Sequence, residues 1–279
     1  MHRVPAFVLL ASIAACASST PTAPSRVAAE NGSIVARAGD PVVDGSFLVP
    51  YENRWKITVT LADGRPRDAG TWTDRLERVT VDARPMLRRT QRESELVTDE
   101  DVHPGLAAKI GGDRLEVTRI NVFDPKTVAP VTSELLTNVK RGSRAQFSGG
   151  RVRVEKSIGD APPIVVDEDL ADAPFDYFGG MFGLLFATLP LREGLSAKLA
   201  AYRPEPGDAH GRLQWVEARV VRRERVAAGP LGERDTWLVE SRGDRSGSLS
   251  FWLSKEPPYV IRLVDTASAE GQTWRYEMF

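Results

Sequence analysis

Alternation of apolar and polar residues along short segments most constrains the fold of this chain. Residues 55–61 alternate Trp, Ile, Val and Leu with Lys and Thr, and residues 249–253 alternate Leu and Phe with Ser and Trp. A period of two places one apolar face on a β-strand. Turn signals such as Asp63-Gly64 separate these segments, and no long amphipathic helix alternates with them. The pattern therefore favours antiparallel strands over a doubly wound parallel sheet.

The same pattern predicts further strands along the chain. In residues 115–122 the apolar positions change phase between Val117 and Ile120, so we expect a bulge there. Other predicted strands cover residues 76–81, 128–136, 152–154, 216–220, 237–239, 259–263 and 274–278. The expected fold class is mainly β, as a curved antiparallel sheet or half-barrel meander packed on one apolar helix at about 175–190.

The predicted helix is apolar on nearly all sides, which is typical of a buried helix. Pro174 precedes it and Pro190 ends it. Two interpretations remain open. The helix fills the concave face of the sheet, or helix and sheet enclose a cleft for a lipid or another apolar ligand. The lining of that cleft would be Phe175, Phe178, Met181, Phe182, Leu185, Phe186 and Leu189.

The N-terminus carries a targeting signal. Arg3 precedes an apolar run over residues 4–14, which is too short to span a bilayer and suits a signal peptide. The sequence Ile13-Ala14-Ala15-Cys16 then resembles the bacterial lipobox. This resemblance implies cleavage before Cys16, a diacylglycerol anchor on its thiol, and sorting to the outer membrane facing the periplasm, because Ala17 replaces a retention Asp. A plain secretory signal is the alternative.

These features divide the chain into three parts. Residues 1–15 form the signal peptide, and residues 16–40 form the lipidated cysteine and a flexible tether rich in Ala, Ser, Thr and Pro. Residues 41–279 form a β-rich domain, either single or divided into 41–160 and 161–279. A tether of this length reaches about 25–30 Å, so we expect the domain to stand just off the membrane.

Composition excludes several functions. Lys and Arg total 37 against 38 Asp and Glu, so no basic surface for nucleic acid is expected. The chain has one Cys and three His, and His103 and His210 lie in turn-like contexts that predict exposed loop residues. We therefore expect no metal site, no cofactor and no catalytic residues. The acidic clusters at 99–101 and 167–169 are interpreted as solvated turns, because neither has the spacing of a calcium loop.

A family resemblance covers roughly residues 115–279. Its motifs are Asp167, Asp169, Pro174-Phe175-Asp176, Leu184-Leu185, Leu189-Pro190-Leu191 and Gly194. Their order resembles an uncharacterised domain family of bacterial exported proteins, which has no established activity and transfers no catalytic residue. The architecture is also similar to the lipoprotein carriers of the localisation (Lol) pathway, and that likeness implies lipid or acyl binding.

The leading functional expectation is a cell-envelope lipoprotein that binds an apolar or lipid-like ligand without catalysis. The first alternative is a structural or interaction lipoprotein whose surface recognises another envelope component. The second alternative is a hydrolase without a recognisable motif.

Overall fold

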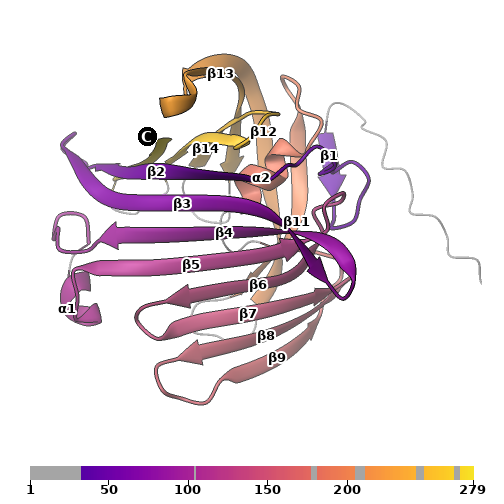
Figure 1. The fold of residues 1–279 in the computed structure, drawn as a ribbon, viewed down its shortest axis with the longest axis horizontal. Helices are drawn as coiled ribbons and strands as arrows, with labels where there is room; N and C mark the ends of the chain where they lie inside the picture. The colour runs from indigo at the N-terminus through magenta and orange to yellow at the C-terminus, as the bar shows by residue number, and fades with distance from the viewer. Residues whose placement is uncertain (1–32, 104, 177–180, 205–210, 243–247, 267–270) are drawn as a thin grey trace, which may run out of the picture.

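A computed structural model describes residues 33–103, 105–176, 181–204, 211–242, 248–266 and 271–279. The described chain is mainly β and forms one curved sheet of 16 strands that does not close (Figure 1). The path of strand pairing runs β1-β11-β12-β13-β14-β15-β16-β2-β3-β4-β5-β6-β7-β8-β9. The expected mainly β fold is therefore confirmed.

The first run of strands is an antiparallel meander in which each strand pairs with the next. It comprises β2 (Tyr51–Thr60), β3 (Pro66–Val81), β4 (Arg84–Leu96), β5 (Arg114–Phe123), β6 (Pro130–Thr137), β7 (Arg141–Ser148), β8 (Arg151–Ile158) and β9 (Ile164–Asp169). A short helix α1 (Leu106–Ile110) lies between β4 and β5. Three of these strands, β4, β7 and β9, have no counterpart among the strands predicted from apolar periodicity.

The second run is also antiparallel and closes against the first. It comprises β11 (Ser196–Pro204), β12 (Gly211–Ala227), β13 (Glu233–Arg242), β14 (Ser248–Leu253), β15 (Val260–Asp265) and β16 (Thr273–Met278), with a 3₁₀ turn η3 (Gly229–Leu231) before β13. The last strand, β16, pairs antiparallel with β2, so the end of the second run meets the start of the first run in the middle of the sheet.

The expectation of a purely antiparallel sheet is wrong at β11. Both β1 (Ser33–Ala36) and β10 (Phe175–Asp176) pair with β11 in parallel. Residues 33–36 fall within the segment predicted as a tether, where Ile34 and Ala36 are buried in the core. β10 reaches β11 through a connection that contains α2, and β1 reaches it from a distant part of the chain, so no hairpin joins either strand to β11.

The predicted helix over residues 175–190 is wrong in its limits. Phe175 and Asp176 belong to β10, and the described helix α2 is Met181–Ala187. The backbone of Phe175 and Asp176 pairs with β11, which requires extended residues. After Ala187 the chain turns, and the Thr188 hydroxyl donates to the Leu185 carbonyl oxygen at 2.6 Å.

The predicted bulge between Val117 and Ile120 is also wrong. β5 pairs with β4 in unbroken register from Arg114 to Phe123. Val117, Asn121 and Phe123 are buried on one face, and that face also carries Arg119. We call the face of the sheet that carries these buried side chains the inner face, and the opposite face the outer face. Polar residues therefore replace apolar ones on the inner face of β5.

The main hydrophobic core lies on the inner face and joins both runs of strands. Trp55 and Ile57 of β2, Leu199 of β11 and Phe251 of β14 are buried in one cluster with α2. A smaller cluster forms where Tyr202 of β11 packs on the inner faces of β7 and β8, against Ala145, Val152 and Val154. The curved sheet thus folds back on itself, and the β11–β12 hairpin covers part of the first run. No helix in the described segments has the length and apolar character to cross a membrane.

Candidate functional site

The predicted ligand-lining residues that the structure describes are all buried. Phe175 comes from β10, Met181, Leu185 and Phe186 come from α2, and Leu189 follows α2. Phe178 lies outside the described residues, as does the side chain of Phe182. The lipidation candidate Cys16 and its lipobox also lie outside them.

Three of these side chains, from Phe175, Met181 and Leu185, line one small hollow between α2, β10 and β5. The free space in it is about 10 Å³, which suits about one water molecule. Asn121 and Asp176 meet at its wall, where the Asn121 amide donates to the Asp176 carboxylate. An acyl chain would fit this hollow only if α2 moved away from the sheet.

α2 packs closely on the sheet. A Cβ added at Gly183 would lie 2.8 Å from Val260 Cγ2, and the Phe186 ring meets the Phe251 ring edge-on at 5.4 Å. The Lys255 ammonium donates to the carbonyl oxygens of Ala187 and Leu189 at 2.5 and 2.9 Å. Ala187 is the last residue of α2, so its carbonyl has no partner within the helix. The contacts fix α2 as part of the core.

A buried ion pair lies on the inner faces of β3 and β4. Arg89 donates to both carboxylate oxygens of Asp74, at 2.9 and 2.6 Å, and both side chains are fully buried. The Tyr51 hydroxyl donates to Asp74 at 2.9 Å. Burial by itself lowers the pKa of Arg89, but the neighbouring Asp74 and Tyr51 raise it by more. The pKa of Arg89 is therefore above its usual value, and the guanidinium stays charged. This pair is structural, because every charged atom is held by a neighbour.

A second polar group lies further along β4. Glu93 accepts from Arg119 at 2.6 Å, and Glu95 lies 3.7 Å from the His103 imidazole. Burial, with the nearby Glu93 carboxylate, raises the pKa of Glu95 to about 8. The prediction that His103 is an exposed loop residue is wrong, because its side chain is 12% exposed and its ring contacts Trp274. The buried position of Glu95 therefore favours its protonated, neutral form.

Exposed hydrophobic side chains concentrate at one end of the sheet. Of the seven large hydrophobic residues that are exposed in the described chain, four belong to β6, β8 and β9. They are Leu136, Ile158, Ile164 and Val165, each about half exposed. Leu136 and Val165 lie on the outer face, whereas Ile158 and Ile164 lie on the inner face. We call this region the β6–β9 end.

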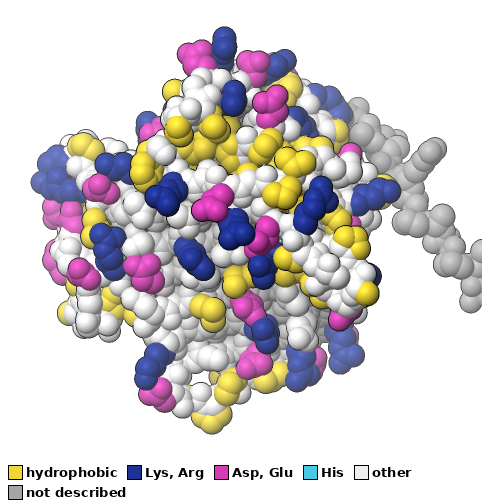
Figure 2. Space-filling model, viewed as in Figure 1, with side chains coloured by type: hydrophobic (Ala, Val, Ile, Leu, Met, Phe, Trp, Pro, Cys, Tyr) yellow, Lys and Arg dark blue, Asp and Glu magenta, His cyan; other side chains and the backbone are white. Residues whose placement is uncertain are grey.

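Figure 2 shows hydrophobic side chains at the lower margin of the molecule, near this end. A further group lies above β2 in the same view. Partly buried hydrophobic side chains of the second run of strands, such as Trp237 and Trp252, pack against the core. The Trp252 indole donates to Glu224 at 2.5 Å. Of the exposed large hydrophobic side chains in the described chain, Val49, Leu231 and Phe279 lie elsewhere, and the other four lie at the β6–β9 end.

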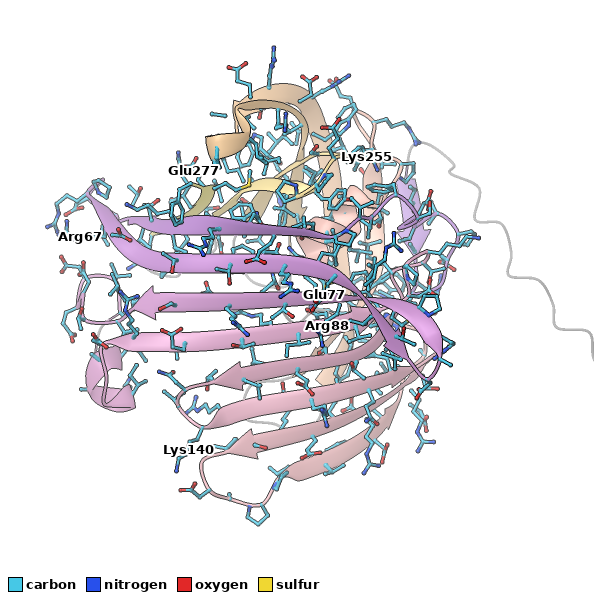
Figure 3. All side chains as sticks on the ribbon, viewed as in Figure 1. Arg67, Glu77, Arg88, Lys140, Lys255 and Glu277 are labelled. Atoms are coloured by element: carbon cyan, nitrogen blue, oxygen red, sulfur yellow. The ribbon has the colours of Figure 1, made fainter. Side chains whose placement is uncertain are left out.

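A shallow hollow of about 490 Å³ crosses the outer face of β6, β7 and β8. Gly142 lies in its lining beside Leu136, whose Cδ2 would be 3.5 Å from a Cβ at that glycine. Charged side chains line the rest, with Arg144 bound to Glu134 and Lys140 bound to Asp160 at 2.8 Å. Figure 3 places Lys140 at the turn between β6 and β7. The hollow therefore exposes the apolar side chain of Leu136 among charged side chains.

β9 is the edge of the sheet at this end. It pairs with β8 on one side, and no described strand pairs with its other side. Its second half is held in place, because Glu168 accepts from the Gly211 amide at 2.7 Å and Leu170 donates to the Gly150 carbonyl. Edge strands with exposed apolar residues can pair with another chain. The arrangement favours a surface for a macromolecule over an enclosed site for a small ligand.

Side chains that bind metal ions do not cluster in the described segments. No group of three or more His, Cys, Asp or Glu side chains there is placed to hold an ion. The acidic segment Asp167–Asp169, interpreted from sequence as a turn, forms the second half of strand β9. Sequence reasoning missed the open edge, and the available signal was the apolar run Ile164–Val166 directly after Pro162-Pro163.

A family model described as a protein of unknown function (DUF3108) matches residues 105–272, which is more than half of the chain. The match covers most of the segment for which the sequence motifs indicated an uncharacterised family. It includes the whole β6–β9 end. A search of curated proteins found no match.

Proposed function

The chain belongs to the DUF3108 family, and for this member we propose a non-catalytic role as a lipid-anchored envelope protein that binds another envelope protein through the β6–β9 end. The observation that carries the proposal is the concentration of exposed Leu136, Ile158, Ile164 and Val165 beside an open sheet edge. Exposed apolar side chains at one place on a soluble domain mark interaction surfaces.

The small free volume beside α2 favours the interaction role over the role of a ligand carrier. The hollow beside Met181 and Leu185 holds about 10 Å³, and α2 is packed against β14 and β15 around Gly183. A lipid carrier needs a cavity of roughly 300 Å³ or more. The lipid anchor belongs to the same proposal and rests on the lipobox resemblance at Cys16.

Crosslinking tests the proposal in the cell envelope. A photoreactive amino acid placed at Leu136 or Val165 should give a discrete adduct with another protein. The same probe at Arg92, which is exposed on the outer face of β4, is the matched control and should give none. Adducts at all three positions, or adducts with lipid alone, would overturn the proposal.

A second measurement addresses the carrier alternative directly. The Cys16→Ser protein should be released from membranes in soluble form, because the thiol that takes the anchor is absent. Native mass spectrometry of that protein should then show the bare chain without a bound lipid. One lipid per chain in this form would refute the interaction role and favour the carrier.

A further inference from the structure

We propose that β9 accepts an extended segment of the partner as an added antiparallel strand, with basic residues opposite Asp167 and Asp169 and an apolar residue opposite Val165. This inference rests on the proposed function and names the chemistry of its partner. The recognition element would read basic-x-basic-x-apolar along the added strand.

The backbone of β9 provides the first argument. β9 is the last strand of the sheet path, and its pairing with β8 spans Ile164 to Asp169 without a register shift. In such a pair the backbone groups of alternate residues point to the free edge, where an extended peptide can bind them. The edge is regular over six residues, which is long enough to pair with one short peptide segment.

Charge gives the second argument. On the outer face Arg153 of β8 pairs with Asp167 at 2.9 Å, and Arg151 of β8 lies 4.0 Å from Asp169. The Asp169 side chain is nevertheless 90% exposed. Each carboxylate therefore has a basic neighbour on the β8 side and an open side at the edge. Basic residues on an added strand would continue the alternation of charge, and opposite charges stabilise cross-strand pairs.

The apolar residues give the third argument and exclude a second copy of this chain. Val165 is 46% exposed on the outer face, and its cross-strand neighbour is Glu155. Full antiparallel pairing of two β9 strands would place Asp169 opposite Ile164 and Glu168 opposite Val165. Such pairs set charges against apolar side chains on both faces. A partner of different sequence suits the edge better than self-association.

The charge of β9 favours a protein over the membrane. The carboxylates of Asp167 and Asp169 are exposed and would repel anionic headgroups.

A peptide experiment tests the inference on the full soluble chain carrying Cys16→Ser. The probe is a fluorescent peptide of sequence Lys-Thr-Lys-Val-Val-Val, and its binding is followed by fluorescence anisotropy. It should bind, whereas the Glu-Thr-Glu-Val-Val-Val peptide and an N-methylated version of the first should not. Equal binding of all three peptides would overturn the inference, because neither charge nor backbone pairing would then matter.

Two variants map the binding to the edge. Asp169→Lys should weaken binding of the Lys-Thr-Lys-Val-Val-Val peptide about fivefold or more, because an attractive cross-strand pair becomes repulsive. Asp235→Lys changes charge equally, at a side chain that is 64% exposed on β13, and should leave binding unchanged. Equal effects of the two variants would show a general charge effect and refute strand addition.

The failures of the two proposals are distinguishable. If crosslinks to a protein form at Leu136 and persist in the Asp169→Lys chain, the partner binds the β6–β9 end without adding a strand, so the inference fails and the proposed function stands. If no protein crosslinks form, the proposed function fails. Binding of phosphatidylglycerol vesicles that Val165→Lys abolishes would overturn both in favour of a membrane contact.

Discussion

Replacing Arg89 by Met should strongly destabilise the domain. The substitution leaves the Asp74 carboxylate fully buried, with Tyr51 as its remaining side-chain donor at 2.9 Å. Breaking a buried ion pair from one side costs about 3–5 kcal/mol, because the other charge stays desolvated and unpaired. For a domain of this size each kcal/mol lowers Tm by about 2–4 °C, so we expect a loss of about 6–20 °C.

The matched control is Arg88→Met on the same strand. Arg88 faces outward and pairs with Glu77 on β3 at 2.7 Å (Figure 3). Both side chains reach solvent, with exposed fractions of 45% and 21%, so this substitution should cost less than about 1 kcal/mol. The double variant Arg89→Met, Asp74→Leu should recover most of the loss, since it removes both charges.

Urea and thermal unfolding followed by circular dichroism measure these differences. Among the three variants, only Arg89→Met removes one partner of the buried ion pair and leaves the other partner in place. If Arg89→Met lowers the free energy of unfolding no more than Arg88→Met does, the claim that Arg89 and Asp74 are an enclosed and mutually dependent pair is refuted.

Three further predictions concern other parts of the molecule. Burial and Glu93 raise the pKa of Glu95 from 4.5 to about 8, so between these pH values the folded chain keeps a proton that the unfolded chain releases. Stability should therefore fall as pH rises from about 4.5 to 8, and Glu95→Gln should flatten that slope in thermal unfolding scans across pH. Gly183→Ala should cost about 1–3 kcal/mol because the added methyl group meets Val260, whereas Gly112→Ala has open space and should be nearly neutral by urea unfolding. Cys16→Ser should move the protein from the membrane to the soluble fraction on cell fractionation, and continued membrane binding would refute the anchor.

Strands with an apolar inner face were predictable from sequence. The alternation of Trp55, Ile57 and Val59 corresponds to β2, and that of Leu249, Phe251 and Leu253 corresponds to β14. Period-two burial of large side chains produces a pattern that is visible without other information. The mainly β architecture follows from these segments alone.

β4 shows why the rest could not be predicted. Its inner face carries Arg89, Gln91, Glu93 and Glu95, so the strand reads as a polar segment although these side chains are largely buried. Their burial depends on partners from other strands, such as Asp74 for Arg89 and Arg119 for Glu93. A pattern of hydrophobicity along one strand contains no information about such partners.

The candidate site likewise depends on contacts between residues that are far apart in the sequence. The open edge of β9 follows from the order of all strands in the sheet, which no local pattern specifies. The packing of α2 required the positions of Phe251 and Val260, which are far from Gly183 in sequence. Exposure of Ile164 and Val165 is likewise a result of where the sheet ends. Sequence alone could place apolar residues on strands, but it could not tell which of them stay uncovered.

The pairing of β16 with β2 has a consequence for folding. Tyr276 is opposite Ile57 across this pairing, so β2 gains this neighbour only after β3–β15 have been synthesised. Until β16 is in place, one border of β2 stays unpaired and the two runs of strands are not joined there. Non-local closure of this kind slows folding and lengthens exposure to aggregation. A chain that leaves the ribosome N-terminus first therefore carries an unfinished sheet until β16 follows.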